Sequence, residues 1–239
     1  MYLGLYWFDR EQNVSSATRT VLQTLYVFQK IDFEIFTKYR LILSPSKSYY
    51  FALNDNIDVT FNELLPVVLD RFRKDEKLKS ISHDHVSELG FRFSFLTDNP
   101  NKYRHALSFS LGRKGSNLTN NLLYDYNLGY GKDFNWFRNL LIELLTIVSP
   151  VKWGGVIDYR FCKDVLQQDV KEYFIGWLNY FSNKIELPPI PTDKYIIEPF
   201  RDEGKIIATT QELWDRNNPE IVSKAMELVN IFRQNNIIW

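Results

Sequence analysis

The sequence has 239 residues but only one cysteine, Cys162, and three histidines. A single thiol excludes a disulfide within the chain and is typical of a protein from a reducing compartment. The chain also has no excess of charge of either sign, because 29 basic residues balance 29 acidic ones. Proteins that bind the phosphate backbone of DNA or RNA usually carry an excess of Lys and Arg. The composition therefore disfavours direct binding to nucleic acid.

Long apolar runs are absent as well. One of the longest, LLIELLTIV at 140–148, is far too short to span a bilayer. Met1 leads directly into the segment YLGLYWF, without the basic stretch and small-residue cleavage site of a secretory signal. We therefore expect a cytoplasmic protein with no membrane partner.

Glycine and proline are sparse, with 10 and 9 residues, and the chain has no repeat, low-complexity tract or Gly/Ser linker. The breaks at 44–48, 97–102, 129–131 and 187–193 do not shift the composition enough to mark a boundary. Hydrophobic residues make up 45% and aromatic residues 16%, which is enough to form a large core. We expect one domain over residues 1–239.

In the middle of the chain, apolar and polar residues alternate as in a β-hairpin that has one solvent-exposed face. Phenylalanines and leucines alternate with polar or small residues over 89–95 and again over 105–111. Further strands are predicted at Tyr2–Phe8, Leu122–Tyr126, Val156–Phe161, Tyr195–Pro199 and Ile206–Thr210, the last two paired across a turn.

Helices are predicted between these strands from capping residues and apolar stripes of helical spacing. The expected starts are Ser15 or Ser16, Asp32 for a short helix through Tyr39, Thr60 with Glu63 as a capping box, Asp133, and Asn218 followed by Pro219. Pro66 suggests a bend, and the ambiguous segment Val165–Asn183 is interpreted as helix because of its length. Strands and helices mix without strict βαβ alternation, so the predicted class is α+β, an antiparallel sheet packed with several helices.

Signatures of catalysis are missing. The sequence contains no G-x-S-x-G, H-E-x-x-H or phosphate-binding loop, and Cys162 has no neighbouring base that would activate it. Paired acids such as Asp55 with Asp58 stand among turn and charged residues, which is typical of a solvated surface. We therefore predict a protein that is not an enzyme and needs no cofactor.

One alternative is a metal-dependent enzyme with a non-standard site at His83-Asp84-His85. Alternate residues of an extended chain lie on the same side, so both imidazoles could converge on a metal, joined by an acid or by His105 from a neighbouring strand. The other interpretation is a polar connection before the sheet, with His105 packed on it.

Aromatic residues beside acids suggest a protein interface instead. They occur at Tyr124-Asp125-Tyr126 and at Trp153-Gly154-Gly155 with Asp158-Tyr159. Exposed rings beside acids are typical of binding hot spots, and the alternative is that the rings are core and the acids surface.

A series of short motifs resembles the bacterial immunity protein 52 family. It begins with Tyr6-Trp7-Phe8-Asp9-Arg10, continues at Glu88-Leu89-Gly90-Phe91 and Gly176-Trp177-Leu178, and ends with Asn218-Pro219-Glu220 leading into a helix. The order and spacing cover nearly the whole chain. Phe8 departs from the pattern, since a small residue is expected there.

The resemblance implies an immunity protein that binds and neutralises a cognate toxin in bacterial competition, such as one delivered by type VI secretion. It implies a toxin that is a nuclease with a restriction-endonuclease-like fold. We expect inhibition by occlusion of the toxin's active site, and the alternative is clamping of the toxin in an inactive shape. The family has no catalytic residues to carry over. For the toxin-binding surface we predict a cluster of acids with an aromatic and a basic anchor. Its members are Asp9, Arg10, Glu11, Asp125, Trp153 and Asp158.

Overall fold

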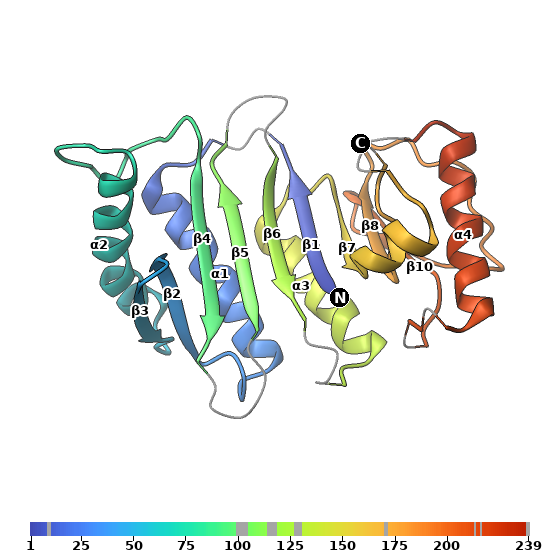
Figure 1. The fold of residues 1–239 in the computed structure, drawn as a ribbon, viewed down its shortest axis with the longest axis horizontal. Coiled ribbons are helices and arrows are strands. Elements are labelled where there is room, and N and C mark those ends of the chain that lie inside the picture. The colour runs from blue at the N-terminus through green and yellow to red at the C-terminus, as the bar shows by residue number, and fades with distance from the viewer. Residues whose placement is uncertain are drawn as a thin grey trace.

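A ten-stranded antiparallel sheet forms the centre of the molecule (Figure 1). The computed structural model describes residues 1–8, 11–98, 105–113, 119–126, 131–169, 172–212, 214–215 and 217–237. The strands are β1 (Tyr2–Trp7), β2 (Lys38–Ser44), β3 (Lys47–Ala52), β4 (Phe91–Thr97), β5 (Ala106–Leu111), β6 (Asn120–Asp125), β7 (Trp153–Ile157), β8 (Leu178–Ser182), β9 (Ile196–Phe200) and β10 (Gly204–Ala208). Their order across the sheet is β3-β2-β4-β5-β6-β1-β7-β8-β10-β9. The predicted α+β class is confirmed.

Strand β1 joins two halves of the sheet. It pairs with β6 on one side and with β7 on the other, both antiparallel. Leu3, Leu5 and Trp7 point to one face and are buried, while Tyr2 and Tyr6 point to the opposite face. The sheet therefore has two chemically different faces on either side of its first strand.

The larger core lies between the sheet and a layer of three helices. These helices are α1 (Val14–Ile31), α2 (Ile57–Asp75) and α3 (Phe134–Val148). Figure 1 shows α1 and α3 behind the strands, and the core joins their apolar stripes to β1, β2, β4, β5 and β6. Phe72 of α2 packs edge-on against Phe91 and Phe93, with ring centroids 4.9 and 5.5 Å apart.

A second core lies on the opposite face, in the C-terminal half. It is covered by the short π-helix η2 (Phe161–Val165) and by α4 (Pro219–Gln234). Phe181 of β8, for example, packs against Phe232 of α4 with ring centroids 5.1 Å apart. Because other side chains of β8 and β10 enter the larger core, this half of the sheet is enclosed on both faces.

Several predicted elements are confirmed in detail. β4 and β5 form the expected hairpin, with Phe93 opposite Phe109. β9 and β10 pair across a turn as expected. Asp133 caps α3, and Asn218 caps α4 with Pro219 at its first position.

Other predictions were wrong. Asp32 does not start a helix but ends α1, and the segment after it turns into β2 and β3, which the sequence interpretation missed. The segment Val165–Asn183 is not one helix, because it contains the end of η2 and all of β8. β8 is buried along its whole length, so tertiary burial overrode the local pattern there.

The predicted helix starts also need correction. The side chain of Asn13, not Ser15 or Ser16, caps α1 by accepting the Ser16 N–H at 2.8 Å. Asn56 caps α2, so that Thr60 lies inside the helix and its hydroxyl accepts the Asn54 N–H at 3.0 Å. Pro66 lies within α2. Among the described helices, none is both long and apolar enough to cross a bilayer.

Candidate protein-binding surface

One face of the N-terminal half of the sheet carries no helix in the described parts of the chain (Figure 1). The strand pattern explains why. In β4 the phenylalanines point to the helices and are buried, while Arg92, Ser94 and Leu96 point away and are partly or fully exposed. We call the surface formed by the outward residues of β2, β4, β5 and β6 the open face.

Small side chains fill the middle of the open face. Strand register places Ser94 opposite Ser108, Ser108 opposite Leu123, and Leu123 opposite Gly4 of β1. Ser110 continues this region next to Ser108 on β5. These residues belong to hydrogen-bonded strands and change little on binding, so their ordering cost is low.

Aromatic rings of β1 and β7 form one border of the open face. Tyr6 stacks on Trp153 with ring centroids 4.7 Å apart and an interplanar angle of 17°. A Cβ on Gly4 would lie 2.9 Å from the Tyr6 ring, so glycine is what allows this ring to lie along the strand. Burial raises the pKa of Tyr6 to about 12 and also raises the pKa of Tyr2, which hydrogen-bonds to it. Both hydroxyls are therefore neutral at ordinary pH.

Beyond this border, a cavity of about 540 Å³ opens beside Tyr2. Its lining residues are Met1, Tyr2, Asp158, Tyr159, Arg160, Trp214, Asp215 and Asn217. Local hydrogen bonds fix the two acids. The Asp158 carboxylate accepts the backbone N–H groups of Arg160 and Phe161 at 3.1 and 3.2 Å, and Asp215 accepts that of Asn217 at 2.8 Å.

The cavity and the open face meet at Tyr2. This residue is the cross-strand neighbour of Asp125 on β6, and on its other side it is the neighbour of Ile157, which precedes Asp158. Three acids, Asp125, Asp158 and Asp215, therefore stand around Tyr2, with Arg160 as the basic group of the cavity. We call this region the acidic end of the open face.

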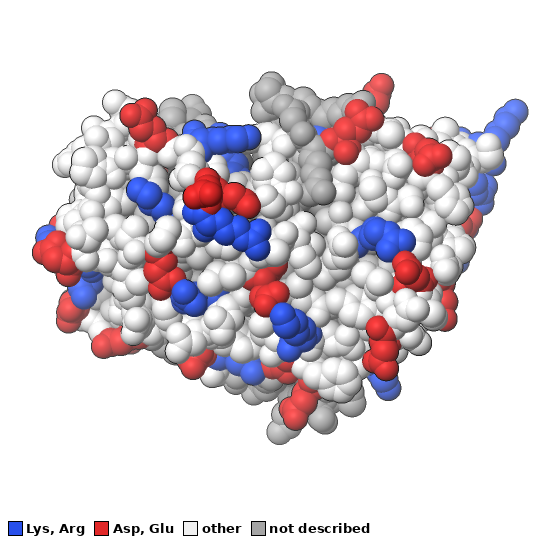
Figure 2. Space-filling model, turned by 180° about the vertical axis from the view of Figure 1, so that it is seen from behind, with Lys and Arg blue, Asp and Glu red and all other residues white. Residues whose placement is uncertain are grey.

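Charge on the open face is divided between its two sides. The outward residues of β2 and β4 include Lys38, Arg40 and Arg92, with the exposed Asp98 next to Lys38, so that side carries more basic than acidic groups. The helix-covered side of the molecule differs, because there basic and acidic residues are interspersed (Figure 2). A surface divided by charge gives a partner one preferred orientation.

The structure brings together only part of the predicted toxin-binding cluster. Asp125 and Asp158 lie on either side of Tyr2. Trp153 is 4% exposed and lies at the far end of the strands, opposite Tyr6. Glu11 is exposed and follows that same far end of β1. Asp9 and Arg10 lie outside the described residues.

Sequence reasoning missed Tyr2, Tyr6, Arg160 and Asp215 as members of this surface. The signal for the two tyrosines was present, because they alternate with Leu3, Leu5 and Trp7. It was interpreted as an ordinary buried strand. No local signal marks Asp215, since its neighbourhood with Tyr2 depends on the fold.

The histidines of the metal hypothesis have structural contacts. The Nε2 atom of His85 lies 2.7 Å from a Glu76 carboxylate oxygen. The carbonyls of His85 and His83 accept the N–H groups of Val14 and Ser15 at 2.9 and 3.3 Å, at the start of α1. Within the described ranges, no three His, Cys, Asp or Glu side chains gather closely enough to hold a metal ion.

The third histidine and the cysteine are buried. The Tyr124 hydroxyl and His105 Nδ1 lie 2.8 Å apart. Burial lowers the pKa of His105, although Asp32 and Asp125 act in the opposite direction. Burial raises the pKa of the Cys162 thiol far above its usual range, so the thiol stays protonated and unreactive.

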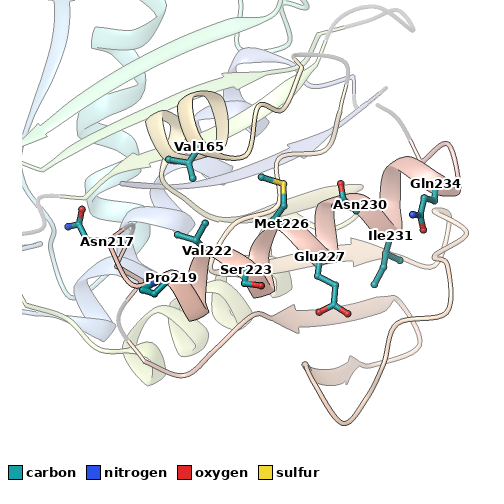
Figure 3. A pocket seen from close by; sticks show the side chains of 10 residues that line it. All are labelled: Val165, Asn217, Pro219, Val222, Ser223, Met226, Glu227, Asn230, Ile231 and Gln234. Carbon is teal, nitrogen blue, oxygen red and sulfur yellow. The ribbon is translucent and has the colours of Figure 1, made fainter.

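A different surface lies on the outer side of α4, where a shallow cavity measures about 950 Å³ (Figure 3). Val222 and Met226 project from the side of α4 that faces Val165 of η2, whereas Ile231 projects from the other side of the helix (Figure 3). Glu227 is held by Lys194 at 2.6 Å. This surface mixes apolar side chains with the polar Ser223, Asn230 and Gln234, and it has none of the clustered charge found at the acidic end.

The comparisons with known proteins come from a family model and from solved structures. The Pseudomonas aeruginosa T6SS protein PA0821 has a similar fold, with a TM-score of 0.50 and 12% sequence identity over 95% of this chain and 72% of that one. No curated protein matches the sequence. The family model described as immunity protein 52 matches residues 138–238, which run from α3 to just beyond the end of α4. The predicted resemblance to the immunity protein 52 family is thereby confirmed for this part of the chain.

Proposed function

We propose that the chain is an immunity protein that binds a cognate bacterial toxin and neutralises it through the open face and its acidic end. The family match over residues 138–238 supports the immunity role. The observation that carries the choice of surface is the uncovered sheet face, bordered by the Tyr6–Trp153 stack and by three acids around Tyr2.

The toxin in this proposal is a nuclease, and inhibition is occlusion. A nuclease that grips DNA presents basic residues around its catalytic cleft. Asp125, Asp158 and Asp215 would take the place of the DNA phosphates there, while the small residues of the open face allow close approach. The chain itself performs no reaction in this scheme, so one molecule neutralises one toxin.

The direct test is protection. Cells that express the toxin encoded beside this chain should survive when the chain is co-expressed. With purified proteins, DNA cleavage should stop at one molar equivalent of the chain. A toxin that still cuts DNA at full strength in a tenfold excess would overturn the proposed immunity role.

The surface is tested by removing charge without removing hydrogen bonds. In the triple variant Asp125→Asn, Asp158→Asn, Asp215→Asn, each new amide keeps the acceptor oxygen that caps the turns at Asp158 and Asp215. Buried interfacial charge pairs are each worth about 2–5 kcal/mol when one partner is truncated. We expect at least a ~30-fold weaker affinity for the toxin by calorimetry, with unchanged thermal stability.

A matched control changes the charge by the same amount elsewhere. Asp55→Asn, Glu63→Gln and Asp202→Asn alter exposed acids that do not line the cavity beside Tyr2. We expect this control to bind like the wild type. Met226→Lys, on the outer side of α4, tests the rival surface, and a large loss there with none in the acidic triple would move the binding site to α4.

A further inference from the structure

The two edges of the sheet are unequal. The last strand in one direction is β9, and the last in the other is β3. β9 contains Pro199, which has no N–H to donate, and its Glu198 is held by Arg138 of α3 at 2.8 Å. Such an edge resists the addition of another strand. β3 has neither protection within its six residues.

The free backbone groups of β3 can be assigned from its pairing with β2. The Leu53 N–H donates to the Thr37 carbonyl at 3.0 Å, one position beyond the Lys38–Ala52 pair. Bonded and non-bonded pairs alternate in an antiparallel ladder. Phe51 and Tyr49 therefore bond to β2, while Ser48, Tyr50 and Ala52 direct their N–H and C=O groups to the free edge.

The side chains of β3 leave this edge accessible. Tyr50 is 57% exposed, and Lys47 and Ala52 are exposed too. On the helix-facing side, a cavity of about 580 Å³ separates β3 from α2, with Tyr49 on one wall and Val67 on the other.

We propose that two copies of the chain pair through β3, antiparallel and centred on Tyr50, so that their sheets become continuous. This register places Tyr50 opposite the same residue of the copy, and Ser48 opposite Ala52. It is the register in which all the outward-facing residues find outward-facing partners. Shifting it by two residues leaves one residue of each strand without a partner, and a shift by one would put side chains on the wrong face.

The side chains agree with this register. Tyr49 falls opposite Phe51 of the copy on the helix-facing side, an aromatic cross-strand pair of a kind that stabilises sheets. Within one chain these rings already stack, with centroids 6.2 Å apart. Lys47 is the charged residue of β3, and it falls opposite Leu53 of the copy, so like charges do not face each other.

Cysteine cross-linking tests the register directly, because the native Cys162 is buried and does not form cross-links. The variant Tyr50→Cys should form a disulfide-linked dimer in mild oxidant, since directly opposite residues lie about 5.5 Å apart at Cα, within disulfide range. Ser48→Cys alone should not, but a mixture of Ser48→Cys and Ala52→Cys chains should. Equal cross-linking of all single variants, or none, would overturn the proposal.

Charge substitution at the central position gives an independent readout. By light scattering, the wild type should show twice the chain mass of 28.4 kDa at high concentration. Tyr50→Lys and Tyr50→Asp should each be monomeric, since like charges then face each other, whereas their mixture should dimerise again. If the wild type stays monomeric but Tyr50→Pro weakens toxin binding, the edge takes a toxin strand and the second-copy proposal is wrong. These outcomes do not depend on the immunity role.

Discussion

The two halves of the sheet bury their strands differently. In β4 and β5, buried residues alternate with partly or fully exposed ones, because helices cover one face only. In β7 and β8 every residue is buried, because α3 covers one face and η2 with α4 cover the other. A partner cannot reach the strands in the half enclosed on both faces, whereas it can reach them in the half covered on one face.

The largest expected difference is in stability, between truncating a buried ring in the enclosed half and truncating an outward side chain of the open face. Phe181 is fully buried against Phe232 and Tyr173, so Phe181→Ala should lower the unfolding free energy by about 3–5 kcal/mol. Leu123→Ala, on the open face, should cost about 1 kcal/mol. Urea unfolding measures both, and equal losses would contradict the contrast.

Glycine-to-alanine substitutions compare how much room the backbone has in the enclosed half and outside it. A Cβ on Gly155 would lie 2.4 Å from the Leu178 carbonyl, between two strands of the enclosed half. We expect Gly155→Ala to cost about 2–3 kcal/mol in chemical unfolding. Gly131 has a φ of +67° and no atom within 4 Å of an added Cβ. Gly131→Ala should therefore lower the unfolding free energy by about 1 kcal/mol, from backbone strain alone.

Helix caps should not distinguish the halves. Asn13 caps α1 beneath the open half, and Asn218 caps α4 in the enclosed half, each by accepting one N–H. Replacing either with alanine should cost about 1 kcal/mol, while aspartate should retain the stability. A loss at Asn13 much larger than at Asn218 in thermal unfolding would show that the single helix layer is the weaker one.

The smallest effect concerns the pH dependence of stability. Burial lowers the pKa of His105 in the folded chain, so below the unfolded value of about 6.5 the unfolded state binds a proton that the folded state resists. Stability should therefore fall as the pH drops through this value. His105→Gln should flatten the profile in unfolding experiments, and an unchanged slope would assign the effect to other groups.

The sequence predicted the elements whose burial is one-sided. The alternation of β4 and β5 and the capping signals of α3 and α4 were interpreted correctly because one face of each element meets water. β8 was mistaken for helix because burial on both faces removes the period of two. β2 and β3 were missed because Asp32 is as good a helix signal as many true caps.

The site was less predictable than the fold. Asp125 and Asp158 come together because β1 inserts between β6 and β7 and places Tyr2 between them. Trp153 was grouped with them by its neighbours in sequence, but it stands opposite Tyr6, at the other end of the strand. Long-range pairing of this kind leaves no local pattern that a sequence interpretation can use.

The central position of β1 also has a consequence for synthesis. Of the ten strands, β1 leaves the ribosome first, yet its neighbours β6 and β7 end at Asp125 and Ile157. The nascent chain must therefore carry an unpaired segment rich in leucine and aromatic residues at least until β6 has been made. Such a segment is a target for chaperones and a source of aggregation, and the two halves of the sheet can be locked together only late in biogenesis.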